Sequence, residues 1–430
     1  MKYSIAKGTF DILPKDPTPD GAWRNSHLWQ YVEEVIRDVT KVYGFQEIRT
    51  PIFERTELFV RGVGESSDIV TKEMYTFEDR AGRLMTLRPE GTASVMRAFI
   101  EKHLDQQKGV HKLYYIGPMF RYERPQAGRF RQHHQFGVEA IGDGSAEQDV
   151  EVIDLLCEFY RKLGLEKLTV MLNSVGDVSS RERYRKALRT FLQPKFEDLS
   201  AESKVRFEKN VLRILDSKNG EDQKLLEGAP SILDFLSEEA KEHFDRVQSL
   251  LKNLKIDYVI NPKLVRGLDY YSKTVFEVTA GELGAHNSIG AGGRFDGLSS
   301  LLGGPDLPSI GFATGLERVI QTMIGQNVPM PSPLGPLLYF IPLGDAAKEF
   351  CLEQVYALRH EGIPTEIDLR EKKVGASIER ASSIGARFVV VFGEEEMLSK
   401  NLVIKELDTR EEFSLSLDQL SHWLRNQLMG

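Results

Sequence analysis

The sequence predicts an α+β core that is interrupted by a helical insertion and followed by a small α/β domain. Residues 112–141 are typical of two strands joined by a long loop, because aromatic and β-branched flanks surround Pro125 and Gly128. Residues 177–257 are highly charged and lack the alternation of strands. A stiff linker then precedes the last part of the chain, with prolines at Pro329, Pro331, Pro333 and Pro336.

These observations divide the chain into segments. We expect a core at 1–325, a helical insertion within it at 177–258, a proline-rich linker at 326–336 and an α/β domain at 337–430. With 430 residues, 41% of them hydrophobic and 28% charged, the chain has the composition of a globular protein with more than one domain.

Charge and hydropathy limit the possible partners and locations. The formal net charge of −8 excludes broad electrostatic attraction to nucleic acid, so any such binding must be local. No apolar run approaches the roughly 20 residues that span a bilayer, and the N-terminus lacks the apolar stretch of a secretion signal. We therefore expect a cytoplasmic protein without a membrane partner. Cys157 and Cys351 lie far apart in helix-like stretches, which predicts two buried thiols rather than a disulfide or a zinc site.

The first half of the chain alternates helices with strands. An apolar stripe predicts a helix over 20–43, with Asp20 as a possible cap and Gly44 beyond its end. Residues 45–54 read as a strand that Pro51 places at an edge or an interface, and an edge strand is a natural place for a second subunit. Residues 84–92 predict a strand that runs into a helix near Thr92. A capping box then starts a helix over 145–164.

The second half returns to strands after the helical insertion. Strands are expected at 256–260 and 274–279, and residues 311–318 open a helix. Beyond the linker, strands at 337–341, 365–368 and 387–392 alternate with helices at 346–360 and 375–384. This pattern predicts a mostly parallel sheet. The domain carries 11 basic and 16 acidic residues, a net charge of −5, so its composition alone does not indicate nucleic-acid binding.

Polar chemistry is concentrated in the predicted hairpin. Because side chains of a strand alternate between faces, Arg121 and Glu123 are expected on one face of the first strand, and Gln135 and Glu139 on one face of the second. The loop between them is cationic, with Arg121, Arg124, Arg129 and Arg131. Guanidinium groups suit phosphate oxygens, so the loop predicts a polyphosphate or nucleic-acid ligand. The alternative is a solvated basic hairpin.

Three further stretches bear on ligand binding. Two of them allow two interpretations each, and the third excludes a dinucleotide-binding loop. Glu90 and Thr92 lie at the predicted strand-to-helix turn, where they hold a ligand or cap the helix. The basic residues of 181–189 form a solvated helix face or contact a polyanion. Residues 290–297 are rich in glycine but do not fit the dinucleotide fingerprint, and the chain has no Gly-Lys-Ser/Thr loop. If ATP binds, arginines must hold its phosphates.

These residues allow the chain to be matched to a family. Residues 43–54, 120–123 and 311–318 look like the three motifs of class II aminoacyl-tRNA synthetases. Residues 264–271 and 290–297 look like the signatures specific to histidine, and residues 7–12 and 87–92 add to the match. Over essentially its whole length the chain resembles a bacterial-type histidyl-tRNA synthetase.

The resemblance implies a fold and a reaction. The catalytic core of this family is an antiparallel sheet flanked by helices, with an inserted helical domain and a C-terminal anticodon-binding domain. Histidine and ATP react to give histidyl-adenylate, and the terminal ribose of tRNA(His) then takes the histidyl group. We therefore expect L-histidine, ATP and tRNA(His) as partners, and a homodimer. Mg²⁺ is expected to bind mainly through the ATP phosphates, with no protein side chain assigned as its ligand.

The resemblance also implies roles for individual residues. Arg121 and Arg266 would be catalytic, with Arg121 on the α-phosphate and Arg266 between this phosphate and the reacting carboxylate. Glu123 would bind the adenine amino group and Arg318 the γ-phosphate. The histidine site would consist of Glu90, Thr92, Arg121, Gln135, Glu139, Arg266, Tyr270 and Tyr271. Gln126 and Arg129 would contact the acceptor end of tRNA.

One position departs from the family pattern, and two other functions compete. Phe295 stands where the family commonly has tyrosine, so no hydroxyl is present there to bind substrate, although the ring can still pack. A synthetase-like regulatory subunit that binds histidine without charging tRNA is disfavoured because Arg121, Arg266 and Arg318 are all present. An ATP-dependent amide ligase on the same core is disfavoured by the histidine signatures.

Overall fold

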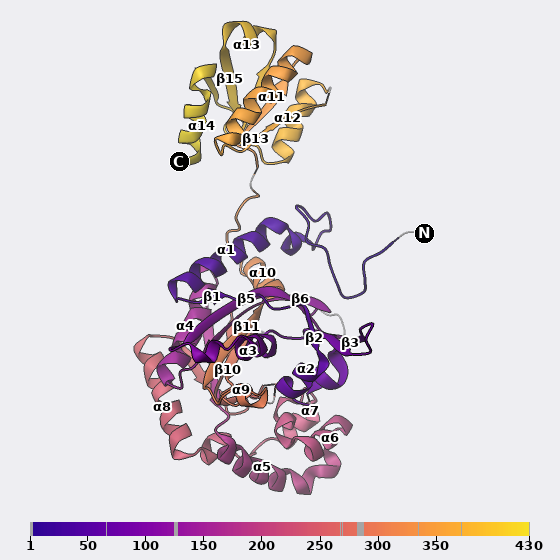
Figure 1. The fold of residues 1–430 in the computed structure, drawn as a ribbon, viewed down its shortest axis with the longest axis vertical. Coiled ribbons are helices and arrows are strands. Elements are labelled where there is room, and N and C mark those ends of the chain that lie inside the picture. The colour runs from indigo at the N-terminus through magenta and orange to yellow at the C-terminus, as the bar shows by residue number, and fades with distance from the viewer. Residues whose placement is uncertain are drawn as a thin grey trace. The chain divides into compact units, whose positions relative to one another are not determined.

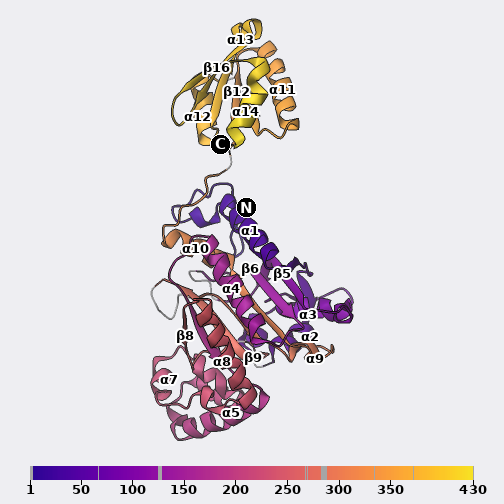
Figure 2. The same cartoon turned by 90° about the vertical axis from the view of Figure 1, so that its left-hand side faces the viewer.

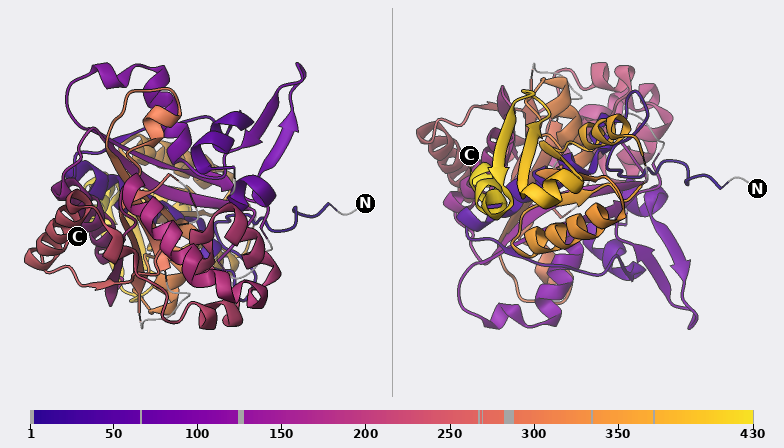
Figure 3. Two further views of the ribbon diagram at one scale, coloured as in Figure 1. Left: turned by 90° about the horizontal axis from the view of Figure 1, so that it is seen from below. Right: turned by 90° about the horizontal axis from the view of Figure 1, so that it is seen from above.

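The computed structural model describes residues 3–65, 67–123, 128–266, 268, 270–281, 288–333, 335–370 and 372–429. The chain forms two compact units, Met1–Met330 (unit 1) and Pro331–Gly430 (unit 2) (Figure 1). Residues 3–7 are exposed, and both views of Figure 3 show the N-terminal end standing clear of unit 1.

Unit 1 is built on an eight-stranded sheet in the order β1-β5-β6-β11-β10-β9-β7-β8. Neighbouring strands from β5 to β7 in this order pair antiparallel, whereas the edge strands β1 and β8 pair parallel to their neighbours. The strands are β1 (Gln46–Glu47), β5 (His111–Phe120), β6 (Gln132–Ile141), β7 (Leu168–Ser174), β8 (Tyr258–Ile260), β9 (Ser272–Ala280), β10 (Ser288–Arg294) and β11 (Ser309–Gly315). The antiparallel core sheet and the long-looped hairpin β5–β6 are thereby confirmed.

One face of this sheet is covered by α1 (Ser26–Val42), α4 (Ala146–Lys162), α8 (Glu238–Asn253) and α10 (Leu316–Gly325) (Figure 2). Phe136, Phe276 and Phe312 point from the strands into the core that these helices close. On the opposite face, Val95 of α3 (Thr92–Glu101) packs against Tyr115 and Met119 of β5. The shorter helices of unit 1 are η1 (Ala22–Arg24), α2 (Thr56–Val63), η2 (Ile69–Glu73), α3 (Thr92–Glu101), η3 (Leu104–Gln106) and α9 (Leu298–Leu301).

The helix predicted over 20–43 begins later than expected. Its N-cap is Asn25 and not Asp20, because η1 precedes it and a bridge between Leu13 and Asn25 holds the chain extended at that point. The end of the helix was predicted correctly, since Gly44 follows it with a φ of +76°, a conformation that glycine adopts without strain. Ser145 caps α4 as predicted, since its side chain accepts from the Gln148 N–H. The reciprocal half of the predicted capping box is not formed, because the Gln148 side chain donates to Glu151 and the Ser145 N–H donates to Asp143.

The strand predicted over 45–54 is two strands in two sheets. β1 lies at the edge of the large sheet, as expected, but β2 (Phe53–Arg55) belongs to a separate antiparallel sheet in the order β2-β4-β3. Pro51 lies between them and cannot donate to either ladder. The other strands of the small sheet are β3 (Tyr75–Glu78) and β4 (Leu84–Leu87), and β4 leads into α3 at Thr92 as predicted.

The inserted segment is helical, as its composition predicted. It consists of α5 (Val178–Leu192), η4 (Gln193–Asp198), α6 (Ala201–Lys209), η5 (Val211–Asp216), α7 (Gly220–Leu225), η6 (Ile232–Phe235) and α8 (Glu238–Asn253). Figures 1 and 2 show these helices gathered at one end of unit 1. Leu188 and Phe207 share a core with Val275 of β9, so the insertion packs onto the eight-stranded sheet.

Unit 2 is a five-stranded sheet in the order β13-β12-β14-β15-β16. Its strands are β12 (Leu338–Pro342), β13 (Thr365–Ile367), β14 (Phe388–Phe392), β15 (Asn401–Glu406) and β16 (Glu412–Ser416), and its helices are α11 (Asp345–His360), α12 (Val374–Ser383), α13 (Glu394–Ser399), η7 (Leu417–Gln419) and α14 (Leu420–Met429). α11 and α14 pack on one face and α12 on the other. The predicted strands are parallel, but β15 and β16 pair antiparallel and were not predicted.

Two other expectations can be compared with the structure. Cys157 and Cys351 are free and buried, as predicted. No helix within the described ranges is long and apolar enough to cross a membrane.

Candidate active site

The sheet face opposite α4 carries a row of small residues between two polar side chains. The pairing register places Tyr115, Gly137, Ala313, Ala291 and Glu277 side by side across five strands. Residues in direct register share a face of an antiparallel sheet. The small residues keep the middle of this face low, and a Cβ on Gly137 would lie only 2.4 Å from the Tyr115 ring. The result is a floor bounded by polar groups.

Glu139 projects from the same face, two residues along β6 from Gly137. Its side chain is 1% exposed, and its Oε1 accepts a hydrogen bond of 2.7 Å from the Thr92 hydroxyl. Its Oε2 has no partner among the described residues. A Cβ on Gly311 would lie only 2.1 Å from this oxygen, so the glycine leaves room for it. Burial raises the pKa of this carboxyl well above its usual value. Glu139 therefore presents one unsatisfied oxygen to the space above the floor.

Glu90 and Thr92 lie at the N-terminus of α3. The Glu90 carboxylate accepts from the backbone N–H groups of Thr92 at 2.7 Å and of Ala93 at 2.9 Å, so Glu90 caps the helix. Burial raises the pKa of Glu90, and these hydrogen bonds and the charge of Arg121 oppose the rise. The cap does not exclude a ligand, because each carboxylate oxygen accepts more than one hydrogen bond.

Two further buried polar atoms on this face have no hydrogen-bond partner among the described residues. One is Oε1 of Gln135, which β6 places on the same side as Glu139, and the other is the hydroxyl oxygen of Tyr115. Burial, together with the charges of Glu139 and Glu90, raises the pKa of Tyr115 well above its usual value. Tyr115 therefore lies close to the two buried carboxylates.

Arg266 reaches the floor from the loop before β9. One of its terminal nitrogens, Nη1, forms an ion pair with Oε1 of Glu277, and its buried Nε has no partner within the described part of the chain. Burial alone would lower the pKa of this guanidinium, but Tyr271 and Glu277 raise it. The rings of Tyr270 and Tyr271 contact each other at a tilt of 50°, with their centroids 4.8 Å apart, and burial raises the pKa of each tyrosine.

The other predicted phosphate ligands form a cluster at the loop end of the hairpin. Arg121 and Glu123 lie beyond the end of β5 and not within the strand as predicted, and Arg121 donates from Nε to the Pro89 carbonyl at 2.8 Å. Glu123 pairs with Arg129 at 3.2 Å. Arg318 of α10 donates to the Ser288 carbonyl at 2.6 Å, and burial and the nearby Arg129 lower its pKa. Arg124 and Gln126 lie outside the described residues.

Comparisons with known proteins identify the family. The family model described as histidyl-tRNA synthetase matches residues 15–319, and that of an anticodon binding domain matches residues 338–427. The chain belongs to the histidyl-tRNA synthetase family. A histidine–tRNA ligase of Protochlamydia amoebophila is 56% identical over 426 residues, which span 99% of this chain and 100% of the relative. That of Bacillus subtilis is 45% identical and covers 100% of both chains.

A solved structure supports the same assignment. The apo histidyl-tRNA synthetase of S. aureus matches with a TM-score of 0.82 and 35% identity, over 98% of this chain and 100% of that chain. The fold is therefore that of a class II synthetase, with a C-terminal unit of the anticodon-binding type. Within the described residues no group of three or more His, Cys, Asp or Glu side chains is arranged to hold a metal ion.

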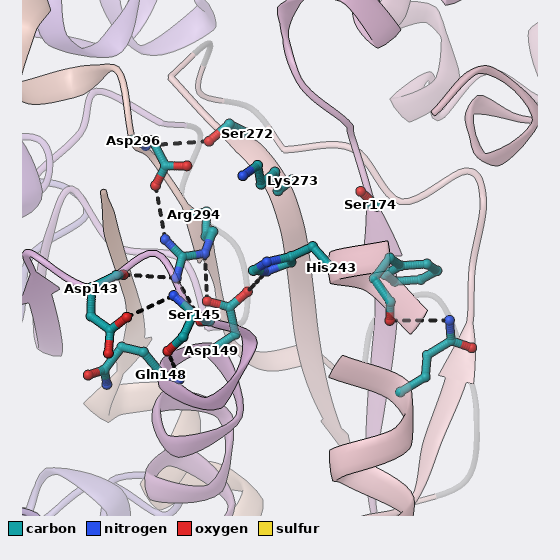
Figure 4. A network of polar contacts seen from close by, with 12 residues as sticks. Asp143, Ser145, Gln148, Asp149, Ser174, His243, Ser272, Lys273, Arg294 and Asp296 are labelled. Atoms are coloured by element: carbon teal, nitrogen blue, oxygen red, sulfur yellow. Dashed lines mark hydrogen bonds and ion pairs between the residues drawn. The ribbon is translucent and has the colours of Figure 1, made fainter. Parts of the chain in front are cut away.

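The second histidine signature of the synthetase family does not line the floor as a whole. Arg294 is fully buried and lies 2.7 Å from Asp149 of α4, which in turn contacts His243 of α8 at 2.7 Å (Figure 4). Arg294 also pairs with Asp296 at 3.0 Å. Phe295 is 2% exposed and packs against Tyr270 with the ring centroids 5.7 Å apart. These three residues of 290–297 hold elements together.

Sequence reasoning missed several residues of the site. Tyr115 and Glu277 were not assigned, although Glu277 is an acidic residue between the apolar Phe276 and Val278 of a predicted strand, and this was a usable signal. His133 was also missed. Burial and the charges of Arg121 and His134 lower its pKa to about 3, so it is neutral near pH 7.

Proposed function

We propose that this chain attaches L-histidine to tRNA(His) through a histidyl-adenylate made from histidine and ATP. One observation carries the proposal: on a single sheet face, four buried polar atoms lack a partner among the described residues, namely Tyr115 Oη, Gln135 Oε1, Glu139 Oε2 and Arg266 Nε. Buried polar atoms are nearly always hydrogen-bonded, so this set calls for a polar ligand. The ligand must offer N–H groups to the acceptors and an anion to the arginine.

Histidine meets these requirements. Its imidazole ring would donate to Glu139 and contact Tyr271, with Tyr270 beside them. Its ammonium group would bind Glu90, Thr92 and Gln135. The Thr92 hydroxyl donates to Glu139, so its oxygen remains free to accept from the ammonium. An amino acid without a ring N–H would leave the Glu139 oxygen unpaired, at a cost of about 1–3 kcal/mol.

ATP would lie along the cationic side of the floor. Arg121 would bind the α-phosphate, Arg318 the γ-phosphate and Glu123 the adenine amino group. Arg266 would lie between the α-phosphate and the carboxylate of histidine. A guanidinium group at this place neutralises the charge that gathers when two anions approach. Mg²⁺ would bind the phosphate oxygens of ATP and neutralise charge on the departing pyrophosphate.

The reaction follows from these positions. An oxygen of the histidine carboxylate attacks the α-phosphorus, the bond from this phosphorus to the bridging oxygen of the β-phosphate breaks, and pyrophosphate leaves. A hydroxyl of the terminal ribose of tRNA then attacks the activated carbonyl carbon, and AMP leaves. Holding both reactants in line supplies much of the rate enhancement.

The tRNA would reach both units. Gln126 and Arg129 of the hairpin loop are proposed at its acceptor end, and unit 2, residues 337–430, at its anticodon. The division into a catalytic domain at 1–325, a helical insertion at 177–258 and a linker at 326–336 remains our proposal, as do the homodimer and the cytoplasmic location.

Two assays test the proposed function. The purified protein should exchange labelled pyrophosphate into ATP only when L-histidine is present, and it should charge tRNA(His). The other proteinogenic amino acids serve as controls for the exchange. A protein that binds histidine but shows neither exchange nor charging would instead be a regulatory subunit.

A further inference from the structure

Glu277 occupies an unusual place for a charged residue. It lies in the middle of β9, between β10 and β7, and faces the site in register with Ala291 and Met171. Its neighbours Phe276 and Val278 point to the other face and are fully buried in the core. A carboxylate at the centre of a rigid strand is fixed in position to a degree that a loop residue is not.

Its partner is Arg266, which follows β8 and precedes β9 and lies outside both strands. The side chains of Arg266 and Glu277 are 23% and 24% exposed, so the ion pair is largely withdrawn from water. Glu277 engages only Nη1 of the guanidinium, and Nε has no partner among the described residues. The contact therefore orients the planar group while leaving other donors for a ligand.

We propose that Glu277 is a positioning residue for adenylate formation. It fixes the Arg266 guanidinium over the sheet floor, so that the arginine meets the histidine carboxylate and the α-phosphate without reordering. This proposal rests on the proposed function of Arg266. Glu277 is assigned no contact with the histidine carboxylate or the α-phosphate, since its own carboxylate would repel both anionic groups. Fixing the arginine beforehand removes the entropic cost of ordering its side chain when the reactants bind.

A double-mutant cycle tests the proposal, with histidine-dependent pyrophosphate exchange as the readout. Glu277→Gln keeps the size of the side chain and removes its charge. We expect the kcat of exchange to fall at least about tenfold, because small displacements of a reacting group have effects of this size. The KM for histidine should change much less, and Glu277→Asp should recover part of the rate.

The same substitution in an Arg266→Ala background separates positioning from a general structural role. Groups that act as a unit are not additive, so Glu277→Gln should have little further effect there. Glu147→Gln, which removes a carboxylate from the exposed Arg246 pair of the same unit, serves as the matched control and should leave exchange unchanged.

Two results would overturn the proposal. Wild-type rates in Glu277→Gln would show that the carboxylate is dispensable, and an equal loss in both backgrounds would show that it acts through another group, such as Arg318. Failure of the proposed function looks different, because the wild-type protein itself would then show no histidine-dependent exchange.

Discussion

Among single residues, Arg266 offers the most direct test of the proposed chemistry. Arg266→Ala should leave the protein folded but lower the rate of pyrophosphate exchange by about 10²-fold or more, because an electrostatic donor at the reacting atoms is lost. Circular dichroism and thermal unfolding check the fold, and the exchange assay measures the rate. A variant that exchanges within a few-fold of the wild-type protein would remove Arg266 from the reacting phosphorus.

His133 connects the site to the pH-dependence of stability. Its pKa is about 3 in the folded protein and 6.5 in the reference state. Between these two pH values the unfolded chain binds more protons at this position than the folded chain does. The free energy of unfolding is therefore unaffected by protonation of His133 above pH 6.5 and decreases as the pH falls toward 3. His133→Asn should reduce the loss of Tm between pH 7 and pH 5, measured by calorimetry. An unchanged difference would mean that His133 does not stay neutral in the fold.

The sequence predicted part of the site at the residue scale. Alternation along β6 correctly placed Gln135 and Glu139 on one face, because this property is local. The row from Tyr115 to Glu277 depends on the register of five strands from distant parts of the chain, which no local pattern encodes. The cap formed by Glu90 was one of two predicted alternatives, and the structure shows this one directly.

At the scale of elements, the buried ion network joins α4, β10 and α8. Asp149 and Arg294 have no exposed surface, and His243 completes the link to the helical insertion. Asp149→Asn should lower the free energy of unfolding by about 3–5 kcal/mol, because it leaves the Arg294 charge buried without its acidic partner on α4. Urea denaturation measures the change.

The control for this prediction lies in the same helix. Glu147→Gln removes an exposed ion pair with Arg246 and should change the free energy of unfolding by less than about 0.5 kcal/mol. Equal effects of the two substitutions would contradict the special role of the buried network.

Strong local signals predicted most elements. The helix α4 and the strands β5 and β6 were found because capping and β-branched residues mark them. β15 and β16 were not predicted, because each mixes charged and apolar residues and the surrounding sequence is rich in acidic residues. Residues 45–54 were predicted as a single edge strand. β1 does lie at a sheet edge, but the chain changes to a second sheet at Pro51.

For the whole molecule, we assign adenylate formation to unit 1 and recognition of the anticodon to unit 2. All the residues proposed for adenylate formation lie in unit 1, which ends at Met330. Unit 2 carries 11 basic and 16 acidic residues from position 337 on, so its contact with RNA cannot rest on broad attraction to phosphate. Recognition of unstacked anticodon bases in a pocket is consistent with that charge.

Truncation after Met330 tests this division. The shortened protein should remain a soluble dimer and exchange pyrophosphate at nearly the full-length rate, because its sheet, helices and ion network do not depend on unit 2 for their core. It should charge tRNA(His) at least about tenfold less efficiently, since the loss of only about 1.4 kcal/mol of tRNA binding has that effect. The kcat/KM for tRNA(His) measures this loss, and adding unit 2 as a separate chain should not restore it, because the linker no longer holds the two units together. Charging at the full-length rate would show that unit 2 does not bind the anticodon, whereas loss of exchange would show that unit 1 needs unit 2 to form its site.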